Sequence, residues 1–370
     1  MDKIALSKCC KILDSMRVPI TASERKPGPY PYYGANGIQD YVSEFLFDDE
    51  LVLLAEDGGN FGSKTKPIAY RVSGKCWVNN HAHVLKPMPG INVDYLCYSL
   101  MFYDTDSLVN GATRQKLTQA AMKEMQIPLR SFGDQIKIVN RIKQALLLIS
   151  ERKRQLSLLE DLMKARFVEM FGDPISNPKK WKIVKIKDVV TDVRYGTSRP
   201  AVEGGKYPYL RMNNLTVDGQ IDLTDLKYID VPESEIEKCI VRKGDVLFNR
   251  TNSIELVGKT ALFNLPDEMV IAGYIIRLRL NKDLLPEILT QYMNLKPLKD
   301  ILRSMAKGAV NQANINAQEL QSINVYLPEM ELQNSFVEFA HQIDKSKVAV
   351  QKSLEKTQLL FDSLMQQYFG

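Results

Sequence analysis

Residues 159–172 read LEDLMKARFVEMFG, and residues 357–370 read TQLLFDSLMQQYFG. Each segment places apolar residues at helical spacing and finishes on a Phe-Gly pair, and an offset of 198 residues relates the two pairs. The same offset relates Leu129 to Leu327, Gln135 to Gln333, Val139 to Val337, Gln144 to Gln342, Leu156 to Leu354 and Leu162 to Leu360. Likeness at one fixed period is typical of an internal repeat, and it predicts a chain built from two similar halves.

The likeness continues upstream with small shifts in register. NGATRQKLTQAAMKEMQIPL (110–129) resembles KGAVNQANINAQELQSINVYL (307–327), YPYYGANGI (30–38) resembles YPYLRMNNL (207–215), and LVLLAEDGG (51–59) loosely resembles DVLFNRTNS (245–253). Each half therefore reads as a variable region followed by a helical segment.

The first helical segment runs without proline or glycine between Asp134 and Met170. Its apolar seam consists of Val139, Ile142, Leu146, Ile149, Leu156, Met163 and Phe167. Steps of three, four and seven residues predict one continuous amphipathic helix, although Lys153 and Glu160 interrupt the seam. Ser131 or Asp134 can cap its start, and Gly172 followed by Pro174 can end it. At ~1.5 Å per residue the helix would be roughly 55–60 Å long.

The second helical segment is predicted from about Glu331 to Tyr368. Its apolar seam consists of Phe336, Phe339, Ile343, Val350, Leu354 and Phe361, with gaps near Lys347 and Thr357. Two long helices with one apolar stripe each cannot both remain solvated on that stripe, so we expect them to pack on one another. The alternative is that each helix packs on its own domain.

The regions 1–125 and 180–322 share a texture of short β-type runs, Gly, Pro and Asn turns, and a short helix such as 93–103. The predicted fold class is therefore α/β, with two globular α/β domains, two long antiparallel helices as a coiled-coil-like spacer, and a pseudo-twofold repeat. The expected boundaries are 1–128 for the first globule, 129–178 for a helical spacer, 179–327 for the second globule and 328–370 for a second spacer.

Composition limits the classes of protein to consider. Net charge is +5 and the pI is near 8.7, which permits nucleic-acid binding without requiring it. The five cysteines show no CxxC spacing, so reduced buried thiols are expected rather than disulfides or zinc ligands. No run of 18 apolar residues and no signal peptide is evident, and a cytoplasmic location is expected.

The sequence contains only incomplete motifs for catalysis or metal binding. GKT at 258–260 lacks the first glycine of a P-loop, because that position is Ser253. His81 and His83 share one face of a possible strand, but a metal site needs more ligands, and hydrogen-bonded histidines are the expected outcome. We therefore expect no catalytic residue, no metal and no cofactor in this chain.

Residues suited to DNA are better represented, and they lie in turn-rich stretches. Arg suits guanine edges, Asn suits adenine edges, and Lys suits phosphates. The candidates are Tyr32, Tyr33, Asn36, Lys64, Asn80, His81, Arg114 and Lys116 in the first region, and Arg194, Tyr195, Arg199, Arg211, Asn213, Asn214, Arg250, Asn252 and Lys259 in the second. Two globules joined by paired helices would suit a duplex with a split site.

These features resemble one protein family. The relevant motifs are YYGANGIQDYV, LLAEDGGNFG and WVNNHAHVL in the first half, GKYPYLRMNNL, KGDVLFNRTN and ELVGKTALF in the second, and IPLRSFGDQIKIVNRI, MFGDP and YLPEMELQNSFVEF around the helices. In order and duplication they resemble the specificity subunit of type I restriction–modification enzymes. Arg130 and Ser131 stand where that family often has prolines, whereas Gln135 is kept.

The resemblance implies that each globule is a target recognition domain that reads one half of a split double-stranded DNA sequence. The helices would set the spacer and dock two modification (methyltransferase) subunits, and restriction/translocase subunits would join them. S-adenosylmethionine, ATP and magnesium would belong to those partners, so this chain would be the non-catalytic part of an adenine-methylating restriction complex. The alternatives are a stand-alone two-headed DNA-binding regulator, an enzyme such as a nuclease, and a protein-binding scaffold without methyltransferase partners.

Overall fold

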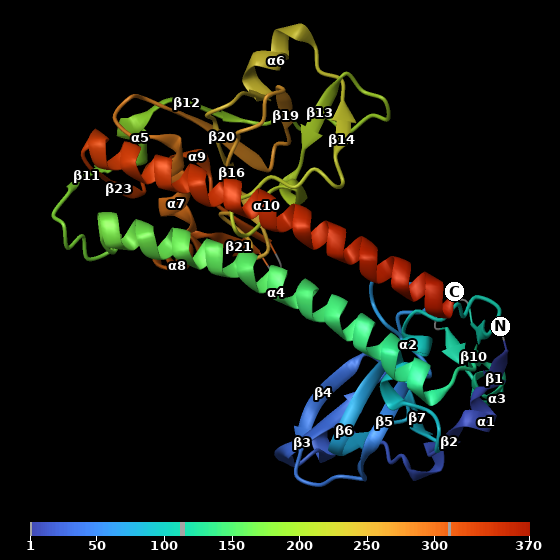
Figure 1. Ribbon diagram of the computed structural model, residues 1–370. Helices are drawn as coiled ribbons and strands as arrows, with labels where there is room; N and C mark the ends of the chain where they lie inside the picture. Colours follow the sequence, from blue (N-terminus) through green and yellow to red (C-terminus); the bar gives the residue numbers. More distant parts are fainter. Residues whose placement is uncertain (1, 112–114, 310–311) are drawn as a thin grey trace. The chain divides into compact units, whose positions relative to one another are not determined.

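The computed structural model describes residues 2–111, 115–309 and 312–370 (Figure 1). The chain divides into two compact units, one formed by residues 1–153 with 352–370 and the other by residues 154–351. Each long helix therefore contributes to both units.

The first unit is built on a six-stranded sheet of order β2-β7-β5-β6-β3-β4. Its strands are β1 (Lys3–Ala5), β2 (Cys10–Ile12), β3 (Pro27–Gly34), β4 (Gly37–Val42), β5 (Phe47–Ala55), β6 (Ala69–Val78), β7 (Ala82–Pro87), β8 (Val109–Asn110), β9 (Lys116–Leu117) and β10 (Gln126–Pro128). Its short helices are α1 (Leu6–Cys9), α2 (Val93–Met101) and α3 (Gln119–Glu124), with 3-10 turns η1 (Asp14–Met16) and η2 (Ala22–Glu24). The helix expected over 93–103 is confirmed as α2.

The second unit has two four-stranded sheets, of order β12-β20-β16-β18 and β14-β13-β19-β15. Its strands are β11 (Lys182–Lys185), β12 (Val190–Tyr195), β13 (Tyr207–Leu210), β14 (Lys227–Ile229), β15 (Ile240–Val241), β16 (Val246–Asn249), β17 (Thr251–Asn252), β18 (Thr260–Leu262), β19 (Met269–Ile271), β20 (Ile275–Leu280), β21 (Lys307–Ala309), β22 (Gln312–Asn314) and β23 (Asn324–Leu327). Its short helices are α5 (Ile186–Val189), α6 (Glu233–Cys239), α7 (Pro286–Asn294), α8 (Lys296–Met305) and α9 (Ala317–Gln321), with the 3-10 turn η3 (Met212–Asn214).

The two units repeat the same strand pairings. The order β2-β7-β5-β6 in the first corresponds to β12-β20-β16-β18 in the second, and all of these neighbours are antiparallel. The parallel pair β3·β6 corresponds to the parallel pair β13·β19, so the one long strand β6 matches two shorter strands, β18 and β19, in the second unit. The antiparallel pair β1·β10, which precedes the first long helix, corresponds to β11·β23, which precedes the second. The internal repeat predicted from the sequence is therefore confirmed at the level of topology.

Both long helices are confirmed, as α4 (Phe132–Phe171) and α10 (Met330–Phe369), with 40 residues each. Ser131 caps α4, because its Oγ accepts the backbone N–H of Asp134 at 3.2 Å. Gly172 ends the helix with a φ of 85°, a left-handed conformation that glycine adopts without strain. The chain direction alternates, because α4 begins in the first unit and ends in the second while α10 does the reverse.

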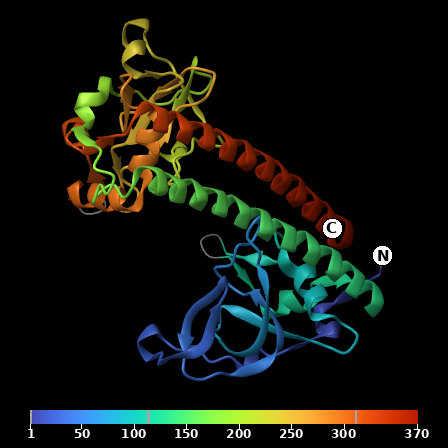
Figure 2. The ribbon, with the colours of Figure 1, turned by 60° about the vertical axis from the view of Figure 1, so that its left-hand side comes forward.

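In each unit, segments of α4 and α10 lie side by side over the sheet (Figures 1 and 2). The first unit buries Val139, Ile142, Ile149 and Phe361 in one core, with Leu146 and Leu354 packed against it. The second unit buries Met163, Phe167, Phe336 and Ile343 with strand and α7 residues, with Phe339 packed against them. Leu156 and Val350 are half-buried. Each helical segment thus packs both on the other helix and on the globule of its unit, so the two alternatives considered from sequence both hold in part.

A buried glutamine fixes the start of each long helix. In the first unit the Gln135 side chain accepts the Asn92 N–H at 2.8 Å and donates to the Gly90 and Arg130 carbonyls, both at 3.0 Å. In the second unit Gln333 accepts the Leu285 N–H at 2.9 Å. Gln333 also donates to the carbonyls of Asp283 at 3.0 Å and Pro328 at 2.9 Å. The identity between Gln135 and Gln333 in the sequence repeat therefore reflects one shared structural role.

Other expectations from composition can be placed on the structure. All five cysteines are buried and free, as expected. Among the described residues, no helix combines the length and the apolar character that a bilayer crossing requires.

Candidate nucleic-acid interface

The same four chain segments meet at the ends of corresponding strands in each unit. In the first unit the linking backbone bonds are Asn79 N to Tyr33 O at 3.0 Å, Glu56 N to His81 O at 2.9 Å and Leu117 N to Glu56 O at 2.7 Å. In the second unit they are Ala272 N to Leu210 O, Arg250 N to Tyr274 O and Ile315 N to Arg250 O, all at 2.9 Å. Position by position, Glu56 therefore corresponds to Arg250, and His81 to Tyr274. We call these loop clusters the first and second reading edges.

The first reading edge gathers three of the predicted DNA-binding residues around the turn 56–58. Asn36 donates to the Gly58 carbonyl at 2.9 Å, and His81 Nδ1 lies 2.7 Å from Asp57 Oδ1. Lys116 Nζ lies 3.1 Å from Glu56 Oε1. These side chains come from the β3–β4 turn, the turn before β7 and strand β9, so the tertiary fold brings together residues that are 80 positions apart in sequence.

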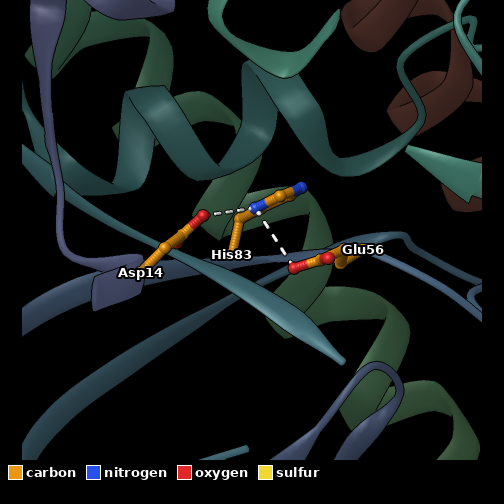
Figure 3. A group of neighbouring side chains, drawn as sticks. All are labelled: Asp14, Glu56 and His83. Atoms are coloured by element: carbon orange, nitrogen blue, oxygen red, sulfur yellow. Dashed lines mark hydrogen bonds and ion pairs between the residues drawn. The ribbon is translucent and has the colours of Figure 1, made fainter. Parts of the chain in front are cut away.

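Beneath this edge lies a buried charge network of Asp14, Glu56 and His83 (Figure 3). His83 Nδ1 lies 2.7 Å from Asp14 Oδ2, and its Nε2 donates to the Leu117 carbonyl at 2.9 Å. A carbonyl oxygen only accepts, so Nε2 carries a hydrogen and offers no lone pair to a metal. Arg17 already pairs with Glu56 at 2.6 Å. The histidines are thus hydrogen-bonded, as expected, and within the described ranges this trio is the only acidic or His/Cys group close enough to hold an ion.

Hydrogen bonds to Asp14 in this network connect the first reading edge to the sheet. Burial by itself would raise the pKa of Asp14, but hydrogen bonds from His83, Gln119 and the Val84 N–H outweigh burial and hold that pKa below its ordinary 3.8. Asp14 therefore remains ionised at neutral pH. It links η1, β7 and α3, which carries Gln119.

The second reading edge surrounds a hollow of about 400 Å³. Four predicted DNA-binding residues line it, namely Arg199, Arg211, Asn213 and Arg250. Thr197, Ser198, the buried Tyr209 and the exposed Tyr274 also line it. The four predicted residues lie in separate turns over 51 positions of sequence, from 199 to 250, and the fold gathers them at one site.

Two of the three arginines of the hollow are already paired. Arg199 donates two hydrogen bonds to the Glu235 carboxylate, from Nε at 3.1 Å and from Nη2 at 2.8 Å. Arg211 donates to Asp225 Oδ2 at 2.6 Å. Arg250 instead places its guanidinium carbon 5.0 Å from the ring centroid of Tyr195. Its positive charge is therefore the least neutralised of the three.

Several other candidates serve the fold. Tyr32 is buried, with its ring 4.2 Å beneath the Arg25 guanidinium. Asn214 is buried and donates to the Asp222 carbonyl at 2.8 Å. Lys259 is buried, which lowers the pKa of its ammonium group, and it donates to the Met212 carbonyl at 2.6 Å. These three have little left to offer DNA, although Lys259 supports the turn that carries Asn213.

The remaining candidates lie at the surface or close to it. Tyr33 is half-buried beside Tyr70, Asn252 donates to the Asn249 side chain at 2.8 Å, and Arg194 pairs with Asp192 at 2.8 Å. Tyr195 is exposed on one face and accepts the Ala317 N–H at 2.8 Å. Lys64 and Asn80 are exposed. Arg114 lies outside the described residues.

Three residues of these edges had not been predicted. Two of them, Glu56 and Asp57, are acidic, and acidic side chains are not expected to contact DNA phosphates. Tyr274 lies in a run, MVIAGYIIRLRL, that reads as continuous β-strand. The one available signal was the glycine at 273, because a Gly inside a strand pattern often marks a bulge or a close approach.

Comparison with known proteins agrees with this duplicated geometry. The type I restriction modification DNA specificity domain matches residues 1–159 and 178–359. The chain belongs to this family. The specificity domain is thus present twice, once in each half, as the repeat and the paired reading edges require.

Named relatives support the assignment of this specificity chain. It is 26% identical over 265 residues to a putative type I restriction enzyme specificity subunit of Haemophilus influenzae, covering 70% of the chain and 67% of the relative. It is 23% identical over 344 residues to the EcoKI specificity subunit of Escherichia coli, covering 86% and 74%. The fold is similar to that of a type I S subunit from M. genitalium, with a TM-score of 0.58, 14% identity and coverage of 100% and 96%.

Proposed function

We propose that this specificity chain selects the DNA sequence for a type I restriction–modification complex, with each reading edge recognising one half of a split site. The observation that carries the proposal is the pair of reading edges, built by the same backbone hydrogen bonds at the ends of corresponding strands but lined by different side chains. Equal frames with unequal side chains suit the recognition of two unlike half-sites. The chain supplies sequence choice, and chemistry belongs to its partners.

The long helices are proposed to set the spacer between the half-sites. Both helices run from one unit into the other, and each is anchored at its start by a buried glutamine. Their length in residues would then decide how many base pairs separate the two halves.

Exposed apolar side chains on these helices are proposed to dock the modification subunits. Within the first unit, Leu147 is 61% exposed and Leu359 is 69% exposed. Isolated exposed leucines are ordinary, but several on one pair of helices are typical of a surface that a partner covers. The modification subunits would bring S-adenosylmethionine and methylate adenine, and restriction subunits would add ATP- and magnesium-dependent translocation and cleavage.

The first test is to map adenine methylation genome-wide with and without this chain. We expect loss of one split motif with a fixed spacer in the deletion strain. Methylation that stays unchanged would remove the basis for the proposal.

The division of labour can then be tested by exchange. Replacing residues 1–125 with those of a relative should change one half-site only, because those residues contain the whole first reading edge. A change in both half-sites would contradict independent reading. Lengthening α4 and α10 by matched insertions should alter the spacer and leave both half-sites unchanged.

The docking surface has its own test. Leu147→Asp should prevent co-purification of the modification subunit, whereas Gln144→Asp, a matched change at an exposed neighbouring position, should not. Equal retention of the partner by both variants would show that this face is not the docking surface. The regulator alternative predicts that the chain binds DNA tightly without such a partner, and the scaffold alternative predicts that it does not bind DNA.

A further inference from the structure

The chain around Arg250 is held rigidly by its neighbours in the second reading edge. Arg250 donates its backbone N–H to Tyr274 O and accepts from the Ile315 N–H, both at 2.9 Å. The preceding residue, Asn249, is fully buried and donates its side-chain amide to the carbonyls of Thr251 and Tyr274, both at 3.1 Å. Asn249 also accepts from the Asn252 amide at 2.8 Å. The side chain of Arg250 therefore projects from a fixed base.

The guanidinium of Arg250 is oriented but not neutralised. It lies over the ring of Tyr195, whose hydroxyl is itself fixed by the Ala317 N–H. Its Nε is buried without a hydrogen-bond partner. Across residues 2–111, 115–309 and 312–370, no carboxylate forms an ion pair with it, in contrast to Arg199 and Arg211. A half-buried cation with unused donors is costly unless a ligand supplies acceptors.

The equivalent position in the first unit has the opposite charge. Glu56 occupies the place of Arg250 in the backbone hydrogen-bond pattern. Its carboxylate forms ion pairs with Arg17 Nη1 at 2.6 Å and with Lys116 Nζ at 3.1 Å. The repeat therefore keeps the backbone frame, but at this position the second unit has a positive charge that no carboxylate of the described residues pairs with, and the first unit has a paired negative charge. The difference points to a ligand contact that the second unit makes and the first does not.

The lining of the hollow indicates the kind of ligand. Three arginines, with Thr197, Ser198 and Asn213, provide many donors, and the hollow is concave. A DNA base edge lies deep within a groove and is reached by side chains that protrude, whereas a backbone phosphate itself protrudes from the duplex. Guanidinium forks match phosphate oxygens with two parallel hydrogen bonds. A phosphate therefore fits this concave, donor-rich hollow better than a base edge.

We propose that the hollow is a seat for one DNA backbone phosphate, with Arg250 as its principal ligand, and that the first unit has no counterpart at Glu56. The proposal rests on the proposed function, since it assigns a contact within the half-site read by the second unit. The seat fixes the register of that unit on the duplex and carries no base preference. Arg211, Asn213 and Ser198 lie around it as further donors.

The experiment uses the full chain in complex with its modification subunits and a duplex that contains the mapped split site. Binding is measured for the wild type, Arg250→Ala and Arg250→Lys across a series of salt concentrations. Arg242→Ala is the matched control, because it removes the same charge from a residue paired with Glu237 and Glu268 outside the hollow. Thermal unfolding of each variant is recorded in parallel.

We expect Arg250→Ala to weaken binding about tenfold or more, as loss of a charge-assisted hydrogen-bond pair would. The slope of log K against log salt should become shallower by about 0.9, the share of one neutralised phosphate. Arg250→Lys should lose less DNA-binding affinity than Arg250→Ala, because lysine keeps the positive charge. The control Arg242→Ala should change the affinity by less than about twofold. The methylated motif should remain the same in every variant.

A scan with neutral methylphosphonate groups on the DNA provides a second arm that needs no protein variant. One position in the half-site of the second unit should weaken wild-type binding, and the same substitution should have no further effect with Arg250→Ala. Relaxation of the motif at one base pair by Arg250→Ala would instead show base reading and overturn the proposal. It would also be overturned by an equal loss of binding in the Arg242→Ala control, or by no loss of binding in Arg250→Ala.

These outcomes separate the two proposals. If the wild-type complex neither methylates nor binds any split site, the proposed function fails. If it does both, but no methylphosphonate position couples to Arg250, only the phosphate seat fails.

Discussion

Replacement of Gln333 by methionine should loosen the start of α10 in the second unit. Gln333 is fully buried, and its amide serves three backbone groups, those of Leu285, Asp283 and Pro328. Methionine has a similar length and helix propensity but can serve none of them. With about 1 kcal/mol lost for each hydrogen bond, and more where a group stays dry, the expected destabilisation is about 3–5 kcal/mol.

The most direct assay is amide hydrogen exchange at Leu285, whose N–H donates to Gln333. A loss of about 3 kcal/mol corresponds to a reduction in protection of roughly 100-fold, at 1.4 kcal/mol per factor of ten. Gln342→Met is the matched control, since Gln342 is an exposed glutamine of the same helix. Gln135→Met should act in the same way on the Asn92 amide of the first unit. If Leu285 exchanges at the wild-type rate in Gln333→Met, the anchoring role assigned to this glutamine is wrong.

Two further predictions concern the cores of the units. Phe167→Ala should destabilise the second unit by about 3–5 kcal/mol, because the ring is fully buried and its centroid lies 5.1 Å from that of Phe336. The control is Leu162→Ala, at an exposed site of the same helix, which should lower the free energy of unfolding by less than about 1 kcal/mol. Chemical denaturation measures both. Asp14→Asn should reduce the free energy of unfolding most at neutral pH. The pKa of Asp14 in the folded protein is below its ordinary value of 3.8, so the carboxylate stabilises the fold fully above pH 3.8. This stabilisation is lost as the pH falls through the lowered pKa of the folded state. Unfolding measured from pH 7 to pH 3 should therefore show the gap between wild type and Asp14→Asn narrowing below about pH 4. A gap of constant size would contradict the network of Figure 3.

Local sequence patterns predicted much of the fold. The seam from Val139 to Phe167 and the absence of proline predicted α4 to within two residues at its start and one at its end. The match between YPYYGANGI and YPYLRMNNL marked β3 and β13, which pair in parallel with corresponding strands. These predictions succeed because periodicity, capping and turn chemistry are properties of neighbouring residues.

The reading edges were harder to predict. Lys259 and Asn214 have side chains typical of DNA contacts, yet they bind the carbonyls of Met212 and Asp222 inside the protein. Arg199, Arg211 and Arg250 look alike in sequence. Glu235 pairs with Arg199 and Asp225 pairs with Arg211, whereas no carboxylate in the described part of the chain pairs with Arg250. Sequence spacing does not show which acidic side chain will arrive beside which arginine.

By itself, therefore, the sequence determined that this chain is a duplicated α/β protein with two long helices, because repeats and amphipathic periods are written along the chain. Only the tertiary structure decided that Glu56 and Arg250 hold equivalent places, one neutralised and one open. That difference depends on Arg17, Lys116 and Tyr195, which reach their partners from 39, 60 and 55 positions away. The availability of a charge is set by neighbours that long-range packing brings together, and no local pattern encodes them.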